Sequence, residues 1–135
     1  MIRDGEGDLY GTTSSGGGGV GTLYRLDAAG NFTVLFRFAG VDLSSPLAGV
    51  VRDAAGNLYG TTSGGGLMNC SFTGCGVVYE LDLSGHYTLL HSFTGGLDRS
   101  FPGANGILEQ AGSLYGITGD GGEAGAGVLY KLALE

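Results

Sequence analysis

The two cysteines of this chain stand at a spacing that suggests covalent chemistry. Cys70 and Cys75 lie close together in a glycine-rich segment, so they can close a small loop as a disulfide in an oxidising compartment. Free thiols and a metal site are the alternatives, although no histidine or second cysteine pair stands at zinc spacing. We therefore predict a Cys70–Cys75 disulfide and no bound metal. The bridge would either stabilise its loop or stiffen it to present a binding surface.

His86 and His91 are the only histidines, and they stand five positions apart along a predicted strand. Side chains alternate between the two faces of a strand, so the two imidazoles point to opposite faces. They cannot easily share a metal ion or act together on one substrate. We therefore expect neither histidine-based catalysis nor a cofactor.

Three acidic residues are weak candidates for glycoside hydrolysis, a reaction that uses a pair of carboxylates beside the glycosidic bond. Asp98, Asp120 and Glu123 lie in connections between predicted strands, and they can act together only if the fold brings them close. The segment around Asp120 and Glu123 has too few carboxylates for a calcium loop. Catalytic residues are otherwise unassigned.

Loop residues are better candidates for ligand binding, because they can project from a scaffold without disturbing its core. Asn69 and Phe72 lie in the same connection as the cysteines, and Asp98 and Phe101 lie in another long connection. The formal net charge is −7, with 6 Lys and Arg against 13 Asp and Glu. This balance argues against nucleic acid as a partner. It favours a neutral or cationic ligand, such as a glycan or a protein.

The composition predicts a packed fold without a membrane span. Hydrophobic residues make up 42% and charged residues 14% of the 135 residues, a composition too apolar for disorder. The chain has no apolar run of the roughly 18 residues that a spanning helix needs. Glycine, with 30 residues, is in large excess but lacks the every-third register of collagen. Tight turns and close approach of strands are the predicted reason.

The elements that must position these residues come as an internal repeat. The pentapeptide at residues 9–13 returns at 58–62 and 114–118, and the block at 21–26 returns at 76–81 and 127–132. The block at 30–38 returns at 85–93 and has no third copy. We therefore expect a single repeat domain, 1–135, with units at approximately 1–48, 49–105 and 106–135. The repeated tyrosines, Tyr10, Tyr59 and Tyr115, should pack between the units, with stacking on a sugar ring as the alternative.

Each complete unit predicts four short strands. In the second unit these lie near 49–52, 57–62, 76–82 and 87–93, and an aspartate opens and a glycine closes the turns at 53–56 and 82–85. No uninterrupted helical period is present. The alternation within 30–38 and 85–93 leaves neither face of that strand polar, which predicts sheets covered on both faces.

These strands predict an all-β, β-propeller-like fold of about three four-stranded antiparallel blades, the last incomplete. Three blades cannot close a ring, since propellers close with roughly four to eight blades. We therefore predict that oligomerisation completes the ring, most simply as a homodimer in which one chain can lend a strand to the other.

The ordered blocks resemble the GloVer tandem repeat of secreted bacterial proteins. The resemblance is carried by Pro-x-Ala-Gly-Val-Val-x-Asp-x-x-Gly-Asn-Leu-Tyr-Gly-Thr-Thr-x-x-Gly-Gly, then Gly-x-Val-Tyr-x-Leu and Gly-x-Tyr-Thr-x-Leu-x-x-Phe, and it covers nearly the whole chain. The third unit departs from it at Ser113 and Ile117 and by lacking the last block. The resemblance implies an extracellular or cell-surface location and a propeller-like array, and it implies no catalytic residues.

We interpret the chain as a non-enzymatic surface module that binds a glycan or a protein through its loops. Two alternatives stay open. One is a glycan-active hydrolase whose carboxylates meet near the propeller axis, and the other is a structural spacer in a longer repeat array.

Overall fold

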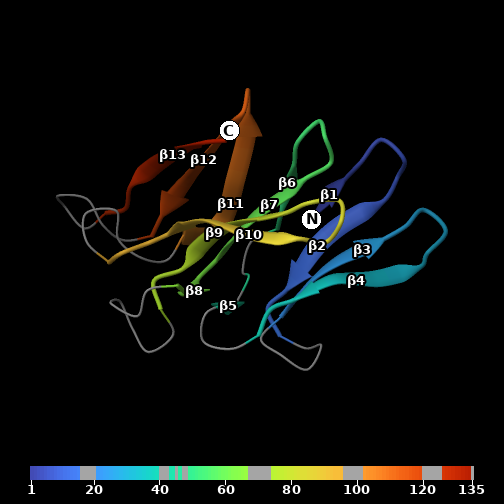
Figure 1. The fold of residues 1–135 in the computed structure, drawn as a ribbon, viewed down its shortest axis with the longest axis horizontal. Helices are drawn as coiled ribbons and strands as arrows, with labels where there is room; N and C mark the ends of the chain where they lie inside the picture. The colour runs from blue at the N-terminus through green and yellow to red at the C-terminus, as the bar shows by residue number, and fades with distance from the viewer. Residues whose placement is uncertain are drawn as a thin grey trace.

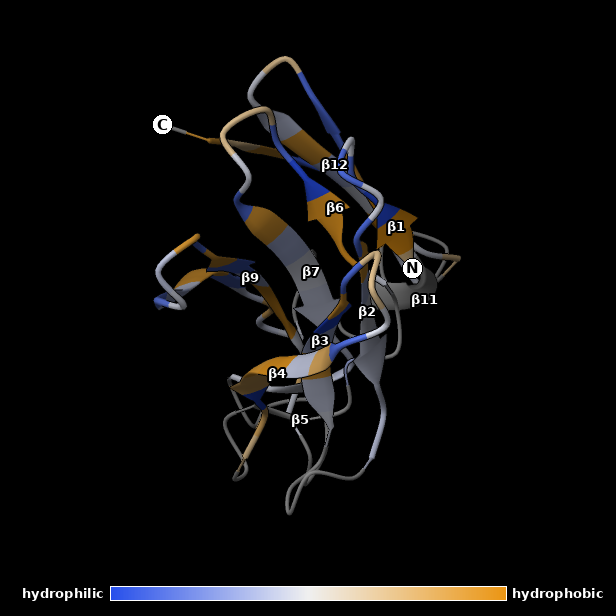
Figure 2. Cartoon of the chain, turned by 90° about the vertical axis from the view of Figure 1, so that its right-hand side faces the viewer, coloured by the Kyte–Doolittle hydropathy of each residue, from blue (hydrophilic) through white to orange (hydrophobic). Residues whose placement is uncertain are grey.

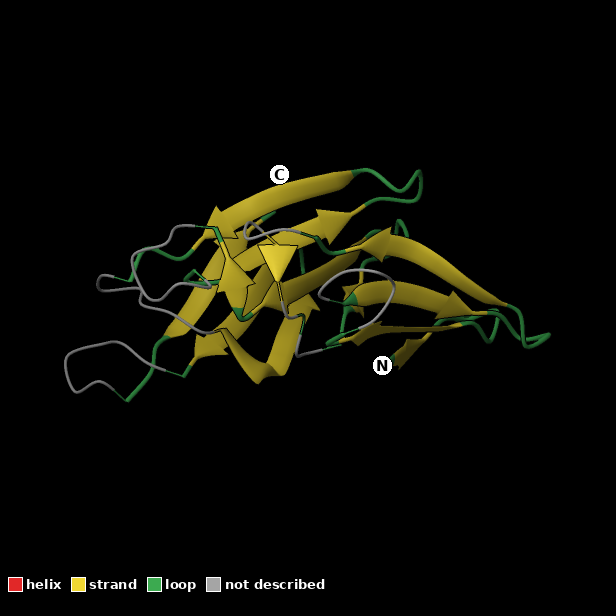
Figure 3. Ribbon diagram, turned by 90° about the horizontal axis from the view of Figure 1, so that it is seen from below, coloured by secondary structure: helices red, strands yellow, loops and turns green. Residues whose placement is uncertain are grey.

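The computed structural model describes residues 1–15, 21–39, 43–44, 46, 49–66, 74–95, 102–119 and 126–134. Within these ranges the chain forms strands and turns and no helix, so the predicted all-β class is confirmed (Figure 3). The described residues also contain no helix that is long and apolar enough to cross a membrane.

Three antiparallel sheets follow one another along the chain, and in Figure 1 they run from the blue strands on the right to the red strands on the left. The first sheet contains β1 (Ile2–Arg3), β2 (Leu9–Thr13), β3 (Thr22–Leu26) and β4 (Phe32–Arg37). The second contains β6 (Val51–Arg52), β7 (Leu58–Thr62), β9 (Val77–Leu81) and β10 (Tyr87–Ser92). The third contains β11 (Pro102–Gln110), β12 (Ser113–Thr118) and β13 (Leu129–Ala133). Strands are neighbours in chain order within each sheet, as the repeat predicts.

A fourth, two-stranded sheet was not predicted from the repeat. β5 (Leu43–Ser44) pairs with β8 (Gly64–Gly65), and Gly65 also forms a parallel bridge with Gly74. This sheet joins the connection that follows β4 to the segment that follows β7.

Four hairpin turns begin with an aspartate whose side chain caps the turn. The Asn57 amide donates to Asp53 Oδ1 at 2.9 Å, and the Gly56 amide donates to the Asp53 carbonyl at 3.1 Å. Gly56 has a φ of 95°, a conformation that glycine adopts without strain. The same two kinds of bond recur in the turns that open at Asp4, Asp27 and Asp82. The predicted turn chemistry is therefore confirmed.

The hairpin between β11 and β12 is tighter and uses different residues. Gln110 pairs directly with Ser113, so only Ala111 and Gly112 form the turn. Both have positive φ, 51° for Ala111 and 78° for Gly112, as a two-residue hairpin turn requires. Glu109 Oε1 accepts a hydrogen bond from the Gly112 amide at 3.0 Å. A residue with a Cβ therefore occupies a position that favours glycine or asparagine.

A tyrosine lies over a glycine of the neighbouring strand in each of the three sheets. The cross-strand pairs are Gly11 with Tyr24, Gly60 with Tyr79, and Gly116 with Tyr130. A Cβ built on any of these glycines would clash with the tyrosine ring and hydroxyl. Close approach of the ring therefore explains why this glycine recurs.

Two hydrophobic clusters join the sheets in series. In the first cluster Leu23 of β3 and Phe38, which follows β4, pack against Leu58 and Tyr79 of the second sheet. The second cluster joins the second and third sheets through these buried residues: Tyr59, Cys75, Val78, Phe93 and Leu114. Apolar residues, orange in Figure 2, occur in β4, β6 and β9 and at the start of β7. We call these two contacts the first junction and the second junction.

The prediction that the sheets are covered on both faces is correct only for the inner strands β7 and β9 of the second sheet, because the fourth strands β4 and β10 keep exposed residues. Every residue of β7 is buried, whereas β13 alternates between exposed and half-buried residues. Leu129 of β13 is 75% exposed, although Leu23 and Val78, at the same position of the repeat, are 0% exposed. The physical reason is that, within the part of the chain that the structure describes, the first and third sheets each pack against another of the three sheets on one side only.

Candidate ligand-binding cleft

The site residues predicted from the sequence lie largely outside the described residues. This applies to Asn69, Cys70, Phe72, Asp98, Phe101, Asp120 and Glu123. Cys75 is described and is completely buried in the second junction. The ligand-binding residues, the catalytic candidates and the Cys70–Cys75 disulfide therefore stay predictions.

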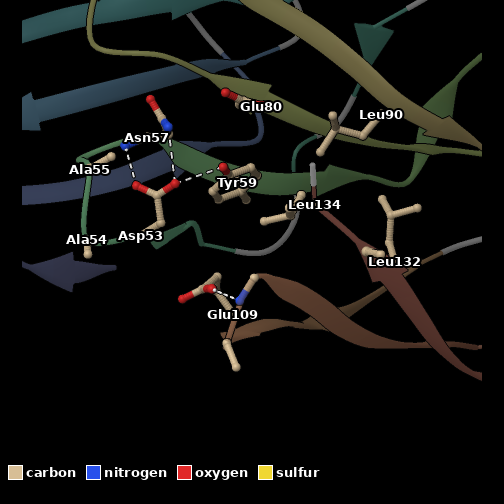
Figure 4. A pocket seen from close by; sticks show the side chains of 13 residues that line it. Asp53, Ala54, Ala55, Asn57, Tyr59, Glu80, Leu90, Glu109, Leu132 and Leu134 are labelled. Atoms are coloured by element: carbon tan, nitrogen blue, oxygen red, sulfur yellow. Dashed lines mark hydrogen bonds between the residues drawn. The ribbon is translucent and has the colours of Figure 1, made fainter.

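A cleft of about 820 Å³ opens at the second junction (Figure 4). The second sheet contributes polar side chains to it, with Asp53 and Asn57 from the turn before β7, Tyr59 from β7 and Glu80 from β9. The third sheet contributes Glu109 from β11 and an apolar wall of Leu132 and Leu134. Glu80 and Glu109 lie on opposite sides of the cleft in Figure 4.

Local hydrogen bonds hold the polar wall of the cleft in place. The Tyr59 hydroxyl donates to Asp53 Oδ2 at 2.9 Å, and Asn57 Nδ2 donates to the same oxygen at 3.1 Å. Tyr59 is also paired with Glu80 across β7 and β9, so both side chains leave the sheet on the same face. The repeat thus places the tyrosine and two carboxylates on one wall through strand register and turn geometry.

The electrostatics of this wall favour an ionised Asp53. Burial pushes the pKa of Asp53 upward, but the hydrogen bonds from Tyr59 and Asn57 outweigh it and lower the pKa below its usual value. Burial and the Asp53 carboxylate raise the pKa of Tyr59, which therefore stays a hydrogen-bond donor. Asp53 is consequently suited to accept hydrogen bonds and unsuited to donate a proton as a general acid.

The equivalent space at the first junction is much smaller, about 130 Å³, and it is lined by Tyr10, Arg25 and Leu35. These residues occupy the repeat positions of Tyr59, Glu80 and Leu90, which line the large cleft. Arg25 extends to Asp8, with Nε at 2.7 Å from the carboxylate.

Arg52 closes the first junction from the other side. Its guanidinium carbon lies 5.9 Å from the centre of the Tyr10 ring, and its Nη1 lies 4.0 Å from Asp4 Oδ2. By sheet register Arg52 corresponds to Glu109, because each pairs with the leucine of the repeated pentapeptide. The second junction therefore carries glutamates at both positions where the first junction carries arginines.

The arrangement of the large cleft can bind hydroxyl groups or a cation. Among the described residues, the carboxylates of Asp53, Glu80 and Glu109 line it, and no Lys or Arg does. Carboxylates accept strong hydrogen bonds from hydroxyl donors and attract positive charge. The leucines beside them offer an apolar surface.

The repeat blocks noted in the sequence extend to a whole-chain match. The family model of the Gloeobacter/Verrucomicrobia repeat matches residues 1–135. The chain belongs to this family. No curated protein and no solved structure matches it.

In this Gloeobacter/Verrucomicrobia repeat chain, a different acidic cluster is explained by turn and ion-pair chemistry. Carboxylate oxygens of Asp4, Glu6 and Asp8 lie within 4.8 Å of one another. Asp8 is ion-paired with Arg25, and Asp4 accepts hydrogen bonds from the Glu6 and Asp8 amides at 3.0 Å each. The carboxylates of Asp4 and Asp8 therefore have structural partners inside the first sheet.

Sequence reasoning missed Glu80 and Glu109 as cleft residues. The signal was present in the repeat comparison, because the position of Glu80 carries Arg25 in the first unit and Lys131 in the third. The position of Glu109 carries Arg52 in the second unit. A change of charge at a position where other units keep a cation is the observation that could have identified them.

Proposed function

We propose that this repeat chain is a non-enzymatic extracellular or cell-surface module that binds a neutral or cationic ligand, a glycan or a protein, at the second junction. The observation that carries the proposal is the replacement of Arg25 and Arg52 by Glu80 and Glu109. This replacement accompanies an increase from about 130 to about 820 Å³ in the space between the sheets. A repeat that only spaced other domains would have no need to open one junction in this way.

The chemistry of the cleft suits a glycan. Sugar hydroxyls can donate to the carboxylates of Asp53, Glu80 and Glu109, and the apolar face of a sugar ring can lie against Leu132 and Leu134. The loop residues Asn69, Phe72, Asp98 and Phe101 are proposed as further contacts. The Cys70–Cys75 disulfide belongs to the same proposal, since it fits an oxidising extracellular setting.

The proposal includes a propeller-like ring that is completed by a second copy of the chain. It is supported by residues at the same register on the innermost strands of all three sheets: Ile2 and Arg3, Val51 and Arg52, and Leu108 and Glu109 line one space of about 310 Å³. Such convergence is expected of blades around an axis. Light scattering should then give twice the 13.6 kDa mass of the chain, and a well-folded monomer would contradict the ring.

The ligand-binding proposal is tested with one variant that makes the second junction resemble the first. In Glu109→Arg the new guanidinium should reach Asp53 and cover Tyr59, as Arg52 reaches Asp4 and Tyr10. Glycans that bind the unmodified protein on an array should bind this variant at least about tenfold more weakly in calorimetry, without a loss of melting temperature.

The control for this experiment is Glu6→Arg, which makes the same charge change at an exposed turn of the first sheet. It should leave binding unchanged. If both variants bind the glycan equally well, the cleft is not the binding site. The loop residues Phe72 and Phe101 would then be the next candidates for glycan contact.

If the protein cleaves a glycan, and if Glu80→Gln or Glu109→Gln abolishes the cleavage, the result would favour the hydrolase hypothesis. Turnover lost instead in Asp98, Asp120 or Glu123 variants would place that activity in the loops. If the protein binds no glycan and no protein on an array, the result would favour the hypothesis of a structural spacer.

A further inference from the structure

The first junction holds an aromatic ring that has no counterpart among the described residues of the second junction. Tyr87 of β10 stacks on Phe36 of the first sheet, with ring centres 4.9 Å apart and an interplanar angle of 15°. It also stacks on Tyr79 of its own sheet at 5.6 Å and 23°. Tyr87 is the first aromatic residue of the fourth strand of its sheet.

The same stacking occurs in the other complete sheet. Phe32, the first aromatic residue of β4, stacks on Tyr24 of β3 at 5.2 Å and 29°. In both four-stranded sheets the fourth strand therefore supplies a ring to the tyrosine of the third strand. The third sheet has three strands among the described residues, and its Tyr130 occupies the position of Tyr24 and Tyr79.

The rest of the aromatic frame at the second junction matches the first. Phe93 meets Tyr130 edge-on at 5.3 Å and 69°, and Phe38 meets Tyr79 at 5.3 Å and 66°. His91 meets Phe93 at 4.9 Å and 86°, and Phe36 meets Phe38 at 5.1 Å and 77°. The receiving surfaces are thus built alike, and only the ring equivalent to Tyr87 is missing from the described part of the second junction.

A cavity lies where that ring would sit. It has a volume of about 170 Å³ and is lined by Val78, His91, Phe93, Tyr130, Lys131 and Leu132. These are the repeat equivalents of Leu23, Phe36, Phe38, Tyr79, Glu80 and Leu81, and all of these except Glu80 pack in the first junction. An apolar cavity of roughly 150 Å³ is large enough to hold benzene. The cavity can therefore accept one aromatic side chain.

The backbone beside the cavity can accept a strand. Within the described residues β13 pairs with β12 on one side only, whereas β3 and β9 are paired on both sides. An unpaired strand edge presents amide and carbonyl groups that an extended segment can bind. In Figure 1 β13 is the outermost strand of its sheet.

We infer that β13 and the cavity beside Tyr130 form an acceptor for the fourth strand of another copy of this repeat. The incoming segment has the form Gly-x-(Phe/Tyr)-Thr-x-Leu-x-x-Phe. It pairs antiparallel with β13, and its first aromatic residue lies opposite Leu132, as Tyr87 lies opposite Leu81. The ring then fills the cavity between Tyr130 and His91. This inference rests on the repeat stacking proposed above and identifies the segment that continues it.

The experiment uses a synthetic peptide with the sequence of residues 85–93, added to the purified chain and followed by calorimetry. We expect saturable binding of one peptide per chain. The peptide carrying Tyr87→Ala should bind at least about tenfold more weakly, because it leaves the cavity empty.

A second peptide, carrying Phe93→Ala, is the matched control. The last phenylalanine of a fourth strand packs on the tyrosine of the next sheet, as Phe38 packs on Tyr79. No sheet follows the third within the described residues, so this peptide should keep most of its affinity. Absent binding, or an equal loss for both alanine peptides, would overturn the inference.

A covalent version tests the same site within the folded chain. We would replace the residues after Leu132 with the sequence of residues 82–93, which supplies a turn and a fourth strand. This extended chain should melt at a higher temperature than the original and should no longer bind the free peptide. The same extension carrying Tyr87→Ala should lose most of the gain. An unchanged melting temperature would contradict the inference.

Light scattering of the original chain separates this inference from the proposed ring. If the chain is a monomer and binds the peptide, the strand-acceptor inference stands and the proposed homodimer is wrong. If the chain is a dimer and does not bind the peptide, the result supports the proposed ring and overturns the strand-acceptor inference.

Discussion

The two junctions of this chain share one aromatic frame but differ in how they are closed. At the first junction Tyr87 fills the frame, and Arg25 and Arg52 bridge to carboxylates of the first sheet. At the second junction Glu80 and Glu109 replace these arginines, and the cavity beside Tyr130 lacks its ring.

This difference shows which residues of the repeat hold the sheets together and which tune the space between them. The tyrosine over glycine and the phenylalanine that ends the fourth strand are common to both junctions, so they set the spacing of the sheets. Positions 25, 52, 80 and 109 vary in charge: Arg52 reaches Asp4 across the first junction, whereas Glu80 and Glu109 line the cleft of the second.

The largest expected effect compares equivalent tyrosines at the two junctions. Tyr79 is 1% exposed and packed by both Phe38 and Tyr87, so Tyr79→Ala should lower the free energy of unfolding by about 3–5 kcal/mol. Tyr130→Ala should cost clearly less, because Tyr130 already borders a cavity. Urea unfolding of both variants measures the two losses. Equal losses would mean that the junctions are packed equally well.

A smaller effect is expected when a methyl group is added beneath these tyrosines. Gly60→Ala should destabilise the protein by about 1–3 kcal/mol, because the new Cβ clashes with Tyr79, which is packed on both sides. Gly116→Ala should cost less, since Tyr130 can shift into its cavity. Gly5→Ala is the control, because a Cβ there meets nothing within 4 Å. Thermal unfolding compares the three, and a similar loss for Gly60→Ala and Gly5→Ala would refute the close approach.

Acid should loosen the hairpins of the first two sheets before the hairpin of the third. The Asn31 side chain and amide lower the pKa of Asp27, and the Ser84 hydroxyl and the His86 amide lower the pKa of Asp82. A carboxyl whose pKa is lowered by folding adds stability above its unfolded pKa, near 3.8, and loses it as the pH falls further. The turn of Ala111 and Gly112 has no such aspartate, and its Glu109 carboxylate accepts a single amide, whereas Asp27 and Asp82 each accept three hydrogen bonds.

Hydrogen exchange measured between about pH 5 and pH 2.5, with intrinsic rates corrected for pH, tests this order. The Asp27 and Asp82 turns should lose protection as the pH falls, and Asp82→Asn should remove the pH dependence at its own turn, because asparagine keeps an oxygen acceptor without titrating. A uniform loss over all hairpins would contradict the role of the aspartates.

The smallest expected effect is a gain of stability in the third sheet. Ala111 has a φ of 51°, where a Cβ is strained, so Ala111→Gly should stabilise the protein by about 0.5–1 kcal/mol. Ala55→Gly, in the aspartate turn of the second sheet, should instead destabilise by a similar amount, because glycine only adds freedom to the unfolded chain there. The melting temperatures of the two variants should therefore change in opposite directions. A change in the same direction would show that Ala111 is not strained in this turn.

Much of the fold could be predicted because its determinants are local. The aspartate and glycine of each turn contact each other within a few residues, as Asp53 and Gly56 do, so the turn is readable from the sequence. The pairing of β5 with β8 depends on a contact between segments distant in the sequence. The candidate cleft escaped prediction for the same reason, since Glu80 and Glu109 belong to different sheets.

The sequence by itself determined the repeat, the all-β class, the order of strands within each sheet and the chemistry of the aspartate turns. These features follow from side-chain alternation and from hydrogen bonds within single hairpins. Only the tertiary structure decided that β7 and β9 of the second sheet are buried, that the space at one junction is small and at the other large, and that Tyr130 borders a cavity. Those outcomes depend on side chains that meet across sheets, where a change from arginine to glutamate or an absent ring alters the space between them.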